Sequence, residues 1–312
     1  MRSKLSLSLI IFSQCCFLPA VRTENLPFFD KSCKYELAKN EHFPEIVLTS
    51  FNTWGLPVTL PGHDQNSRFE NMGYFLLHTN SDILCLQESF HKKLRKKLIS
   101  TLKVKYQTIN IKNKNSLKQG LIPMDCQGGL LTFSVFPVVS ECFLPFPDND
   151  YSLIEKIGGK GVLWTIINVN GKFINILNTH LYAGESDKAE KIRIEQLKLI
   201  QKLILEQASF KDYPTIFSGD FNINHPDLKP SPAYDFITES MCFIDTAPRI
   251  GPDNYTYSGA ENPYISNKNY NTKLDYTFIY DPSSTLKTCE SERILHKIPV
   301  SDHFGWKCRI YQ

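Results

Sequence analysis

Two short motifs in the C-terminal third of the chain carry residue types that can cleave a phosphodiester. Gly-Asp-Phe-Asn occupies 219–222 and Ser-Asp-His occupies 301–303, and they follow apolar runs at 215–217 and 298–300. Such runs predict strands, so the polar residues fall where strands end, and strand ends are where α/β folds build active sites. Together the two motifs indicate half of a metal-assisted phosphodiester-cleaving site.

Further polar residues lie at the ends of other predicted strands. Asn52 follows the apolar run at 46–51, Glu88 follows the run at 83–86, and His180 follows the run at 172–177. The combined set holds four carboxylates, two amides and two imidazoles: Glu88, Asp220, Asp275, Asp302, Asn52, Asn222, His180 and His303.

These residue types suit attack on a phosphodiester, which is already anionic and therefore needs a hard cation to neutralise an oxygen. Magnesium prefers oxygen ligands and is typically held by one or two protein carboxylates, a task that Glu88 and Asn52 suit. A histidine can take a proton from the attacking water when a carboxylate fixes its tautomer. His303 with Asp275 suits that second task.

Asn222 and His180 can donate hydrogen bonds to oxygens that gain charge in the transition state. Each candidate also has an ordinary structural interpretation: Asn52 could cap a turn, Glu88 could be an acid at a helix N-terminus, and His180 could be a satisfied, half-buried imidazole. Taken singly, these interpretations would be favoured. The occurrence of the candidates at successive strand ends favours a site.

The elements that must position these residues follow from the apolar pattern. Strands are predicted at 46–51, 83–86, 128–136, 162–169, 172–177, 215–217, 274–280 and 305–310. Helices are predicted around 69–76, 90–102, 188–207 and 233–240, and the longest loops at 148–160 and 258–272. Asn170-Gly171 predicts a hairpin turn. Hairpin strands interspersed with helices favour an α+β fold in which two mixed sheets pack together with helices outside.

Length and composition leave the partner class open. The chain has 312 residues, 42% of them hydrophobic, so it can bury a sizeable core in one or two domains. A net charge of +3 and a pI of 8.3 are only mildly basic, below the pI of about 9 that marks a dedicated nucleic-acid binder. The densest charge run, at 92–97, favours a solvated helix face over a contact with an anionic surface.

The first twenty residues differ from the rest. Arg2 and Lys4 precede an apolar stretch at 5–21, and Ala20 offers a small residue for cleavage, which predicts a secretory signal peptide at 1–20. The stretch is shorter than the ~20 apolar residues that a spanning helix needs, so an uncleaved anchor is disfavoured. The predicted domain order is the signal peptide, an N-terminal extension at 21–44 and a single catalytic domain at 45–312. The protein is therefore expected to be secreted or exported.

Seven cysteines remain after the predicted signal peptide, so at least one thiol is unpaired within a monomer. In an oxidising compartment the pairs Cys126–Cys142 and Cys289–Cys308 are predicted first, because each closes a short loop. The sequence contains no Cys-x-x-Cys spacing, which argues against a structural zinc site. Cys85 is predicted to be a buried hydrophobe.

The ordered motifs resemble the endonuclease/exonuclease/phosphatase superfamily over about residues 46–310. They are Asn52, Leu-Gln-Glu at 86–88, Asn-Thr-His at 178–180, Gly-Asp-Phe-Asn at 219–222, Leu-Asp-Tyr at 274–276 and Ser-Asp-His at 301–303. The resemblance implies a four-layer α/β/β/α sandwich and magnesium-dependent cleavage of phosphoesters, with Mn²⁺ or Co²⁺ as alternative ions. It implies Glu88 and Asn52 as metal ligands, with Asp302 supporting the metal or its waters.

The same resemblance implies the catalytic roles. His303 would be the general base for in-line attack by water, and Asp275 would be its partner. Asp220 would orient the water, while Asn222 and His180 would steady the phosphoryl group.

Flanking segments are similar to the neutral and bacterial sphingomyelinases within this superfamily. They are Asn-Thr-Trp-Gly at 52–55, Gly-Gly-Leu-Leu-Thr-Phe-Ser at 128–134, Gly-Lys-Gly-Val at 159–162 and Thr-His-Leu-Tyr-Ala at 179–183. The similarity implies hydrolysis of sphingomyelin to phosphocholine and ceramide by an enzyme that meets its phospholipid at a membrane surface and needs no stable protein partner.

Two loops carry aromatic residues that could enter a membrane interface or cage choline: Phe-Leu-Pro-Phe at 143–146, and the loop with Tyr264, Ile265 and Tyr270. Partly packed loops are an equally good interpretation. The tandem-Trp hairpin of haemolytic sphingomyelinases is missing from the sequence, which argues against strong membrane lysis.

Other functions fit the same core. A secreted metal-dependent nuclease would use the lysines at 92–97, and only then would nucleic acid be the partner; a phosphoinositide phosphatase is a further alternative. A binding protein on an inactive phosphodiesterase fold is disfavoured, because every catalytic position holds a competent residue type.

Overall fold

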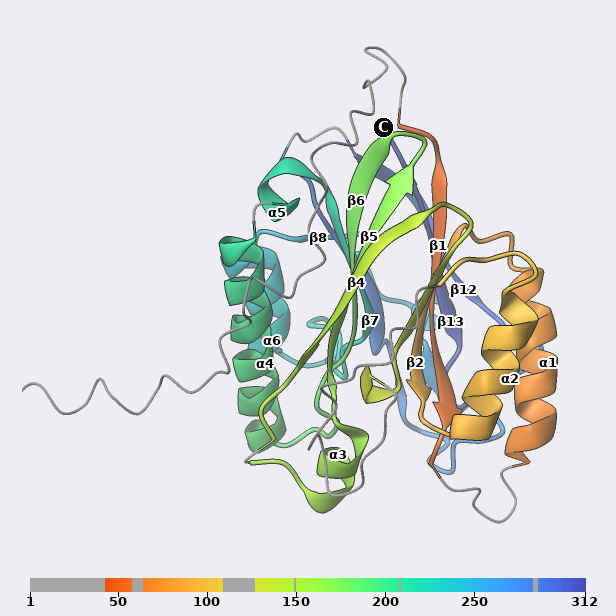
Figure 1. Ribbon diagram of the computed structural model, residues 1–312. Coiled ribbons are helices and arrows are strands. Elements are labelled where there is room, and N and C mark those ends of the chain that lie inside the picture. Colours follow the sequence, from red (N-terminus) through yellow and green to blue (C-terminus); the bar gives the residue numbers. More distant parts are fainter. Residues whose placement is uncertain (1–42, 58–63, 109–126, 149, 208, 283–285) are drawn as a thin grey trace, which may run out of the picture. The chain divides into compact units, whose positions relative to one another are not determined.

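The computed structural model describes residues 43–57, 64–108, 127–148, 150–207, 209–282 and 286–312 (Figure 1). The chain divides into the units Met1–Glu36 and Leu37–Gln312, and every described residue belongs to the second. The predicted signal peptide and nearly all of the predicted extension lie outside the described residues, so these domain boundaries stay predictions. Within the described part, no helix is both long enough and apolar enough to cross a membrane.

Two mixed β-sheets form the centre of the second unit. The strand order is β12-β13-β1-β2-β3 in the five-stranded sheet and β4-β5-β6-β7-β11-β8 in the six-stranded sheet, while β9 and β10 form a separate ribbon. Each large sheet contains one parallel pair, β1 with β2 and β6 with β7. In chain order the strands are β1 (Ile46–Gly55), β2 (Ile83–Ser89), β3 (Leu131–Ser134), β4 (Val138–Pro145), β5 (Gly161–Val169), β6 (Lys172–His180), β7 (Thr215–Asp220), β8 (Ile244–Asp245), β9 (Tyr257–Ser258), β10 (Asn271–Thr272), β11 (Asp275–Tyr280), β12 (Lys287–Ile294) and β13 (Gly305–Tyr311).

Helices cover the outer faces of both sheets. In Figure 1, α1 and α2 flank the five-stranded sheet, and α4 and α6 flank the six-stranded sheet. The helices are α1 (Gln65–Leu77), α2 (Lys92–Leu102), α3 (Leu153–Gly158), α4 (Asp187–Glu206), α5 (Ser209–Asp212) and α6 (Pro232–Asp235), with a π-helical turn η3 (Phe236–Ser240) and 3₁₀ turns η2 (Gln127–Gly129) and η4 (Pro252–Asn254). The predicted four-layer α/β/β/α sandwich is confirmed.

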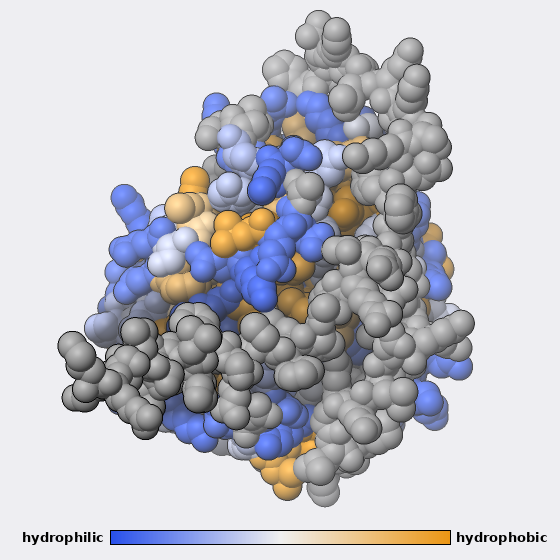
Figure 2. Space-filling view, turned by 60° about the vertical axis from the view of Figure 1, so that its left-hand side comes forward, coloured by the Kyte–Doolittle hydropathy of each residue, from blue (hydrophilic) through white to orange (hydrophobic). Residues whose placement is uncertain are grey.

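The outer layers follow from helical periodicity. Phe69, Met72 and Leu76 form one buried stripe on α1, and Leu94 and Leu98 form another on α2. These stripes join one hydrophobic cluster with the apolar residues of β1 and β2 that face away from the second sheet. Figure 2 views the side on which α4 lies; among its coloured atoms hydrophilic residues predominate, and hydrophobic ones form small groups between them. The outer face of α4 is solvated, because Lys191, Glu195, Lys198 and Lys202 are all exposed.

Strand alternation places the polar residues between the sheets. Side chains two residues apart share a face, so Asn52 lies on the same face of β1 as Ile46 and Leu48, and His180 lies on the same face of β6 as Ile176. The three apolar residues belong to one buried cluster formed by both sheets. The layer between the sheets is thus apolar at one end and polar at the other.

A buried hydrogen bond joins the two sheets in the middle of this layer. Gln87 in β2 donates through Nε2 to Asn178 Oδ1 in β6 over 2.8 Å. Asn178 in turn donates through Nδ2 to the carbonyl of Leu131 over 2.9 Å. Because buried polar groups must be paired, these contacts fix how one sheet lies on the other.

Most predicted elements are confirmed. β5 and β6 form the predicted hairpin, and both turn residues have positive φ, 52° at Asn170 and 93° at Gly171, as a type I′ turn requires. Of the two interpretations of 143–146, exposed and partly packed, the structure favours the packed one, although the segment is mostly strand β4 and not a loop. Phe143 pairs with Leu163 inside the β4–β5 ladder, and Phe146 is only 6% exposed. The proline at 145 had obscured the strand, which it ends.

Three further predictions need correction. The predicted loop at 148–160 contains α3, which Ser152 caps at its N-terminus and Gly159, at φ 53°, caps at its C-terminus. The run at 298–300 is not a strand, so the Ser-Asp-His motif precedes β13 instead of ending a strand. The edge strand β12 was not predicted, because its sequence alternates charged and polar residues with few apolar ones.

The predicted Cys126–Cys142 disulfide is wrong, because Cys142 carries a free thiol in β4. Loop length in the sequence says nothing about whether two Cα atoms come within disulfide range. The side chains of Cys126 and Cys289 lie outside the described residues, so the Cys289–Cys308 pair stays a prediction. Cys85 is buried, as predicted.

Gly219 permits the close approach of β7 to β6, and its replacement should destabilise the fold. It has φ 155°, and a Cβ atom there would lie 2.1 Å from the carbonyl oxygen of Thr179. We expect Gly219→Ala to lower the free energy of unfolding by about 3 kcal/mol, the upper end for overpacking. Gly171→Ala, where a Cβ atom meets nothing within 4 Å, should cost only about 1 kcal/mol of backbone strain. Urea denaturation of both variants measures this, and equal stability losses would contradict it.

Candidate active site

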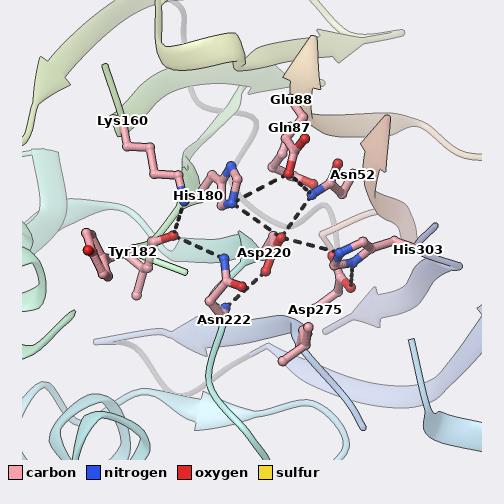
Figure 3. Close-up of polar contacts among 12 residues, drawn as sticks. Asn52, Gln87, Glu88, Lys160, His180, Tyr182, Asp220, Asn222, Asp275 and His303 are labelled. Carbon is pink, nitrogen blue, oxygen red and sulfur yellow. Dashed lines mark hydrogen bonds and ion pairs between the residues drawn. The ribbon is translucent and has the colours of Figure 1, made fainter. Parts of the chain in front are cut away.

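The polar end of the layer between the sheets brings the predicted site residues together (Figure 3). β1, β2, β6 and β7 end at this edge, whereas β11 begins there because it runs antiparallel to β7. Asp275 consequently lies opposite Asp220 in the strand register. β13 runs antiparallel to β1, so the residues just before β13, including His303, reach the same edge.

Asn52 links the two sheets at the centre of the site. It is fully buried, and its Nδ2 donates to Glu88 Oε1 and to Asp220 Oδ2, both over 2.9 Å. Its Oδ1 accepts a hydrogen bond from the backbone N–H of Trp54 over 2.9 Å, which fixes the orientation of the amide. One side chain therefore holds two carboxylates from opposite sheets in place.

His303 and Asp275 form a buried pair. The His303 Nδ1 atom lies 2.8 Å from Asp275 Oδ2, and the His303 Nε2 atom lies 3.7 Å from Asp220 Oδ2. Although burial alone would lower it, the negative charges of Asp275 and Asp220 raise the pKa of His303 well above its ordinary value. With Nδ1–H donated to Asp275, the opposite ring nitrogen faces the carboxylates at the site.

His180 faces the same carboxylates from the other side. Its Nε2 atom is 3.5 Å from Asp220 Oδ2 and 3.9 Å from Glu88 Oε1. Burial, with the nearby Lys160 cation, lowers the pKa of His180 well below its ordinary value. This imidazole is consequently neutral at pH 7, and the two histidines of the site carry different charges.

Asn222 and Lys160 share one acceptor. The Asn222 Nδ2 atom donates to the carbonyl of Leu181 over 3.1 Å, and Lys160 Nζ donates to the same oxygen over 2.8 Å. Lys160 is almost fully buried and also pairs with Glu155 of α3 at 2.7 Å. The Gly-Lys-Gly segment had been noted in the sequence without a role for its lysine, and the structure places that lysine beside His180.

Backbone strain gathers at the site. Trp54, Glu88 and Asn222 all have φ near 50° (47°, 53° and 52°), in the left-handed region that side-chain-bearing residues seldom adopt. The pairing of β1 with β2 shifts register between Asn52 and Gly55, which marks a bulge beside Trp54. Such conformations cost about 1–3 kcal/mol each and are typical of functional sites.

The buried carboxylates make the site suitable for a divalent cation. Burial raises the pKa of Glu88, and it raises the pKa values of Asp220 and Asp302 to about 6. Asp275 Oδ1 is also buried and has no hydrogen-bond partner among the described residues. Buried carboxylates are costly unless a cation or hydrogen bonds compensate them, so this donor set fits a hard oxygen-seeking ion.

The structure groups the candidate ligand atoms differently from the expected set of Glu88, Asn52 and Asp302. Side-chain ligand atoms within 4.8 Å of one another come from Glu88, His180 and Asp220, and in a second group from Asp220, Asp275 and His303. Asn52 turns its NH₂ group toward the carboxylates, and the Asp302 carboxylate accepts a hydrogen bond from Ser301 Oγ over 3.2 Å. The assignment of individual ligands stays a prediction.

The structure favours the partly packed interpretation of the loop that carries Tyr264, Ile265 and Tyr270. Ile265 is 3% exposed, and the two tyrosines are half-buried. Tyr264 lies 5.5 Å from Trp54, and the buried Arg68 guanidinium stacks over both rings, 4.5 Å from that of Trp54 and 5.7 Å from that of Tyr264. The sequence did not identify Arg68 as a residue that supports the site. The only available signal was a charged residue on the otherwise mainly apolar buried face of α1.

Comparisons with known proteins agree with this geometry. A family model described as the endonuclease/exonuclease/phosphatase family matches residues 49–303. Sphingomyelinase C of Bacillus cereus is 29% identical over 199 residues, 57% of each chain, and a phospholipase C of Staphylococcus aureus is 25% identical over 79% of this chain and 73% of its own. A β-toxin variant of Staphylococcus aureus with bound magnesium ions has the same fold, with a TM-score of 0.66, 23% identity, and coverage of 85% of this chain and 99% of its own.

The raised pKa of Asp302 makes the metal-free protein less stable as pH rises. The carboxyl titrates near 3.8 when the chain is unfolded and near 6 when it is folded. Between these values the folded chain binds the extra proton, so raising the pH from 4 to 7 favours unfolding. We expect Asp302→Asn to be stabilised relative to wild type by on the order of 1–3 kcal/mol at pH 7, and by much less at pH 4.

Urea titrations of both proteins in EDTA at the two pH values measure this difference. An advantage of Asp302→Asn that is the same at pH 4 and pH 7 would contradict the prediction.

Proposed function

The chain belongs to the endonuclease/exonuclease/phosphatase family, and from this membership we propose that it is a secreted Mg²⁺-dependent phosphodiesterase that hydrolyses sphingomyelin to phosphocholine and ceramide. The observation that carries the proposal is the arrangement around Asp220. His303, paired with Asp275, faces Asp220 from one side, and neutral His180 faces it from the other. The pKa values of these two imidazoles are shifted in opposite directions, as is required if one is to accept a proton and the other is to stay neutral and donate a hydrogen bond.

His303 has the geometry of a general base. Its Nδ1–H is held by Asp275 over 2.8 Å, so Nε2 is the atom that would take a proton from an attacking water. The raised pKa means that Nε2 must first lose its own proton, which a bound cation that offsets the nearby carboxylate charges would favour. Asp220 Oδ2, 3.7 Å from that nitrogen, can accept a hydrogen bond from the same water and orient it. The developing imidazolium is then stabilised by both carboxylates.

Donors on the opposite side of the site would hold the phosphoryl oxygens. Neutral His180 can donate through Nε2, and Asn222 can donate through an amide whose position is fixed by the Leu181 carbonyl. Lys160, held to the same carbonyl, adds positive charge behind His180. These groups would stabilise charge that develops on the phosphate as the bond to the leaving oxygen breaks.

Mg²⁺ would be held by Glu88, with Asn52, Asp302 and the neighbouring Asp220 around it. When bound, a divalent cation supplies the positive charge that offsets a non-bridging phosphoryl oxygen. Support comes from the crowding of buried carboxylates here and from the magnesium ions in the β-toxin structure. Mn²⁺ and Co²⁺ are alternatives.

The choice of sphingomyelin rests on the relatives and on the aromatic residues beside His303. The related proteins are named sphingomyelinase C and phospholipase C, although the alignment spans only 57% of the length of the first. The Tyr257 ring lies 5.1 Å from that of His303 and 5.7 Å from that of Tyr270. Aromatic rings beside the scissile position can hold a quaternary ammonium such as choline. A phospholipid surface outside the cell would then be the site of action.

A nuclease is the second candidate, favoured by the charge on α2. Lys92, Lys93 and Lys96 are exposed, the helix contains no acid, and it begins just after β2 delivers Glu88 to the site. Such a face could also be merely solvated. Incubating the protein with plasmid DNA distinguishes these cases, because a nuclease would nick DNA with a strong dependence on salt.

We expect purified protein to release phosphocholine from labelled sphingomyelin with Mg²⁺ near neutral pH. His303→Ala should lower kcat by about 10²–10⁴-fold, the contribution of a positioned general base. His78→Ala, an exposed histidine at the end of α1, is the matched control and should retain full activity. No phosphocholine release by wild type, or release of inorganic phosphate from phosphoinositides instead, would contradict the proposed substrate.

Binding of Mg²⁺ should raise the melting temperature of the protein. At a free concentration one hundred times Kd the gain is about 2.7 kcal/mol, because the ion binds only the folded state. Glu88→Gln should weaken this shift strongly by removing a buried carboxylate. The control is Glu195→Gln on the exposed face of α4, which should leave the shift unchanged. Differential scanning calorimetry with and without Mg²⁺ tests this, and an unaltered shift in Glu88→Gln would exclude Glu88 as a ligand.

A further inference from the structure

His303 lies in a segment that no strand supports. β12 ends at Ile294 and β13 begins at Gly305, so the residues between them lack the ladder of backbone hydrogen bonds that holds the other site residues. Val300, Ser301 and His303 are nevertheless buried. The buried backbone of this segment must therefore be held by groups from other parts of the chain.

Asn262 supplies the hydrogen bonds on one side. It is fully buried, and its Nδ2 donates to the carbonyls of Ser301 over 2.9 Å and Asp302 over 3.0 Å. Its Oδ1 accepts from the backbone N–H of Tyr264 over 3.0 Å, which leaves only one orientation of the amide. Both hydrogens of the amide are thus directed at the two carbonyls that precede His303.

The other end of the same loop holds Asp275. Thr256 Oγ1 accepts hydrogen bonds from the backbone N–H groups of Leu274 over 3.0 Å and Asp275 over 3.1 Å. The Thr256 carbonyl accepts from the N–H of Phe304, the residue after His303, over 2.7 Å. The segment at 256–262, which includes β9, therefore contacts the backbone of Asp275 and the backbone of the residues on both sides of His303, and its Tyr257 ring lies 5.1 Å from the His303 ring.

Arg68 of α1 holds the segment before β13 from the other side. Its guanidinium donates to the carbonyl of Val300 over 2.8 Å and to the carbonyl of Trp54 over 2.9 Å. The segment before β13 is held between α1 and the loop at 256–262. Among these contacts, only those of the loop at 256–262 reach both Asp275 and the residues that flank His303.

We propose that the loop at 256–262 is the element that aligns His303 with Asp275, and that Asn262 is a positioning residue for the general base. The assignment rests on the proposed function, because it takes His303 as the base. Asn262 acts through the backbone of Ser301 and Asp302. Its loss would leave one buried and one partly buried carbonyl without their donor and allow the His303 ring to move relative to Asp275.

The first test is kinetic. Asn262→Ala and the isosteric Asn262→Asp, which loses the donor, should lower kcat by about 10–100-fold with KM little changed, because a displacement of about 1 Å at the reacting groups costs about that much. Thr256→Val, which removes the acceptor for the N–H of Asp275, should act in the same direction. Testing three variants keeps the proposal falsifiable if one of them does not fold.

The second test needs neither substrate nor metal. The proton shared by His303 Nδ1 and Asp275 should give a far-downfield NMR resonance that His303→Ala abolishes. We expect the resonance to weaken or shift in Asn262→Ala and Asn262→Asp. Because it reports alignment directly, it decides the proposal even if wild type proves inactive on sphingomyelin.

Asn175 is the matched control. It is also fully buried and lies near the N-terminal end of β6, whereas His180 lies at the C-terminal end. Its amide donates to the carbonyl of Ser209 over 3.0 Å and accepts from Trp164 Nε1 over 2.9 Å. Asn175→Ala should lose comparable stability but keep kcat and the downfield resonance. The proposal is overturned if the Asn262 variants keep the wild-type resonance, or if Asn175→Ala lowers kcat or disturbs the resonance as much as they do.

Discussion

The active site depends on a layer of polar side chains buried between two β-sheets. Burying an amide without a partner costs about 1–3 kcal/mol, and burying a carboxylate costs more, so polar groups in this layer are stabilised by complements from the opposite sheet. Gln87 meets Asn178 in the middle of the layer, and Asn52 meets Asp220 at its open end. These contacts give the sandwich one relative placement of its sheets, and that placement defines the distances within the site.

The same layer accumulates charge that the fold alone does not balance. Glu88, Asp220 and Asp302 have raised pKa values because they are buried close together, and the charge of His303 offsets them only in part. Three residues at the site also have strained backbones. Stability is given up here for a preorganised site, as is common where catalysis and folding make opposing demands. A bound cation would relieve the charge imbalance, which couples the stability of the site to the ion.

Two histidines in one site illustrate how environment assigns roles. His180 and His303 both face Asp220 at less than 4 Å. His180 is buried near Lys160 and meets no carboxylate on its second nitrogen within the described part of the chain, so it remains neutral. His303 has Asp275 on its second nitrogen and holds a proton more tightly. Both residues are histidines, so only their neighbours make His180 suited to donate a hydrogen bond and His303 suited to act as a base.

The amino-acid sequence by itself determined the elements and the chemistry of the site. Period-two and helical spacing are local properties, so β1, β5, β6 and α4 could be predicted, and the motif residues fell at strand ends because polar side chains continue the buried face of each strand. Short or charged elements such as α3 and β12 lacked that spacing and were missed.

Only the tertiary structure decided which residues support the site. Asn262, Arg68 and Lys160 act through carbonyl groups 14 to 232 residues away in the chain. It also decided that the Ser-Asp-His motif precedes a strand and that Cys142 stays unpaired. Contacts of this kind leave no periodic signal, since they depend on how distant segments meet and not on the spacing of neighbours along one of them.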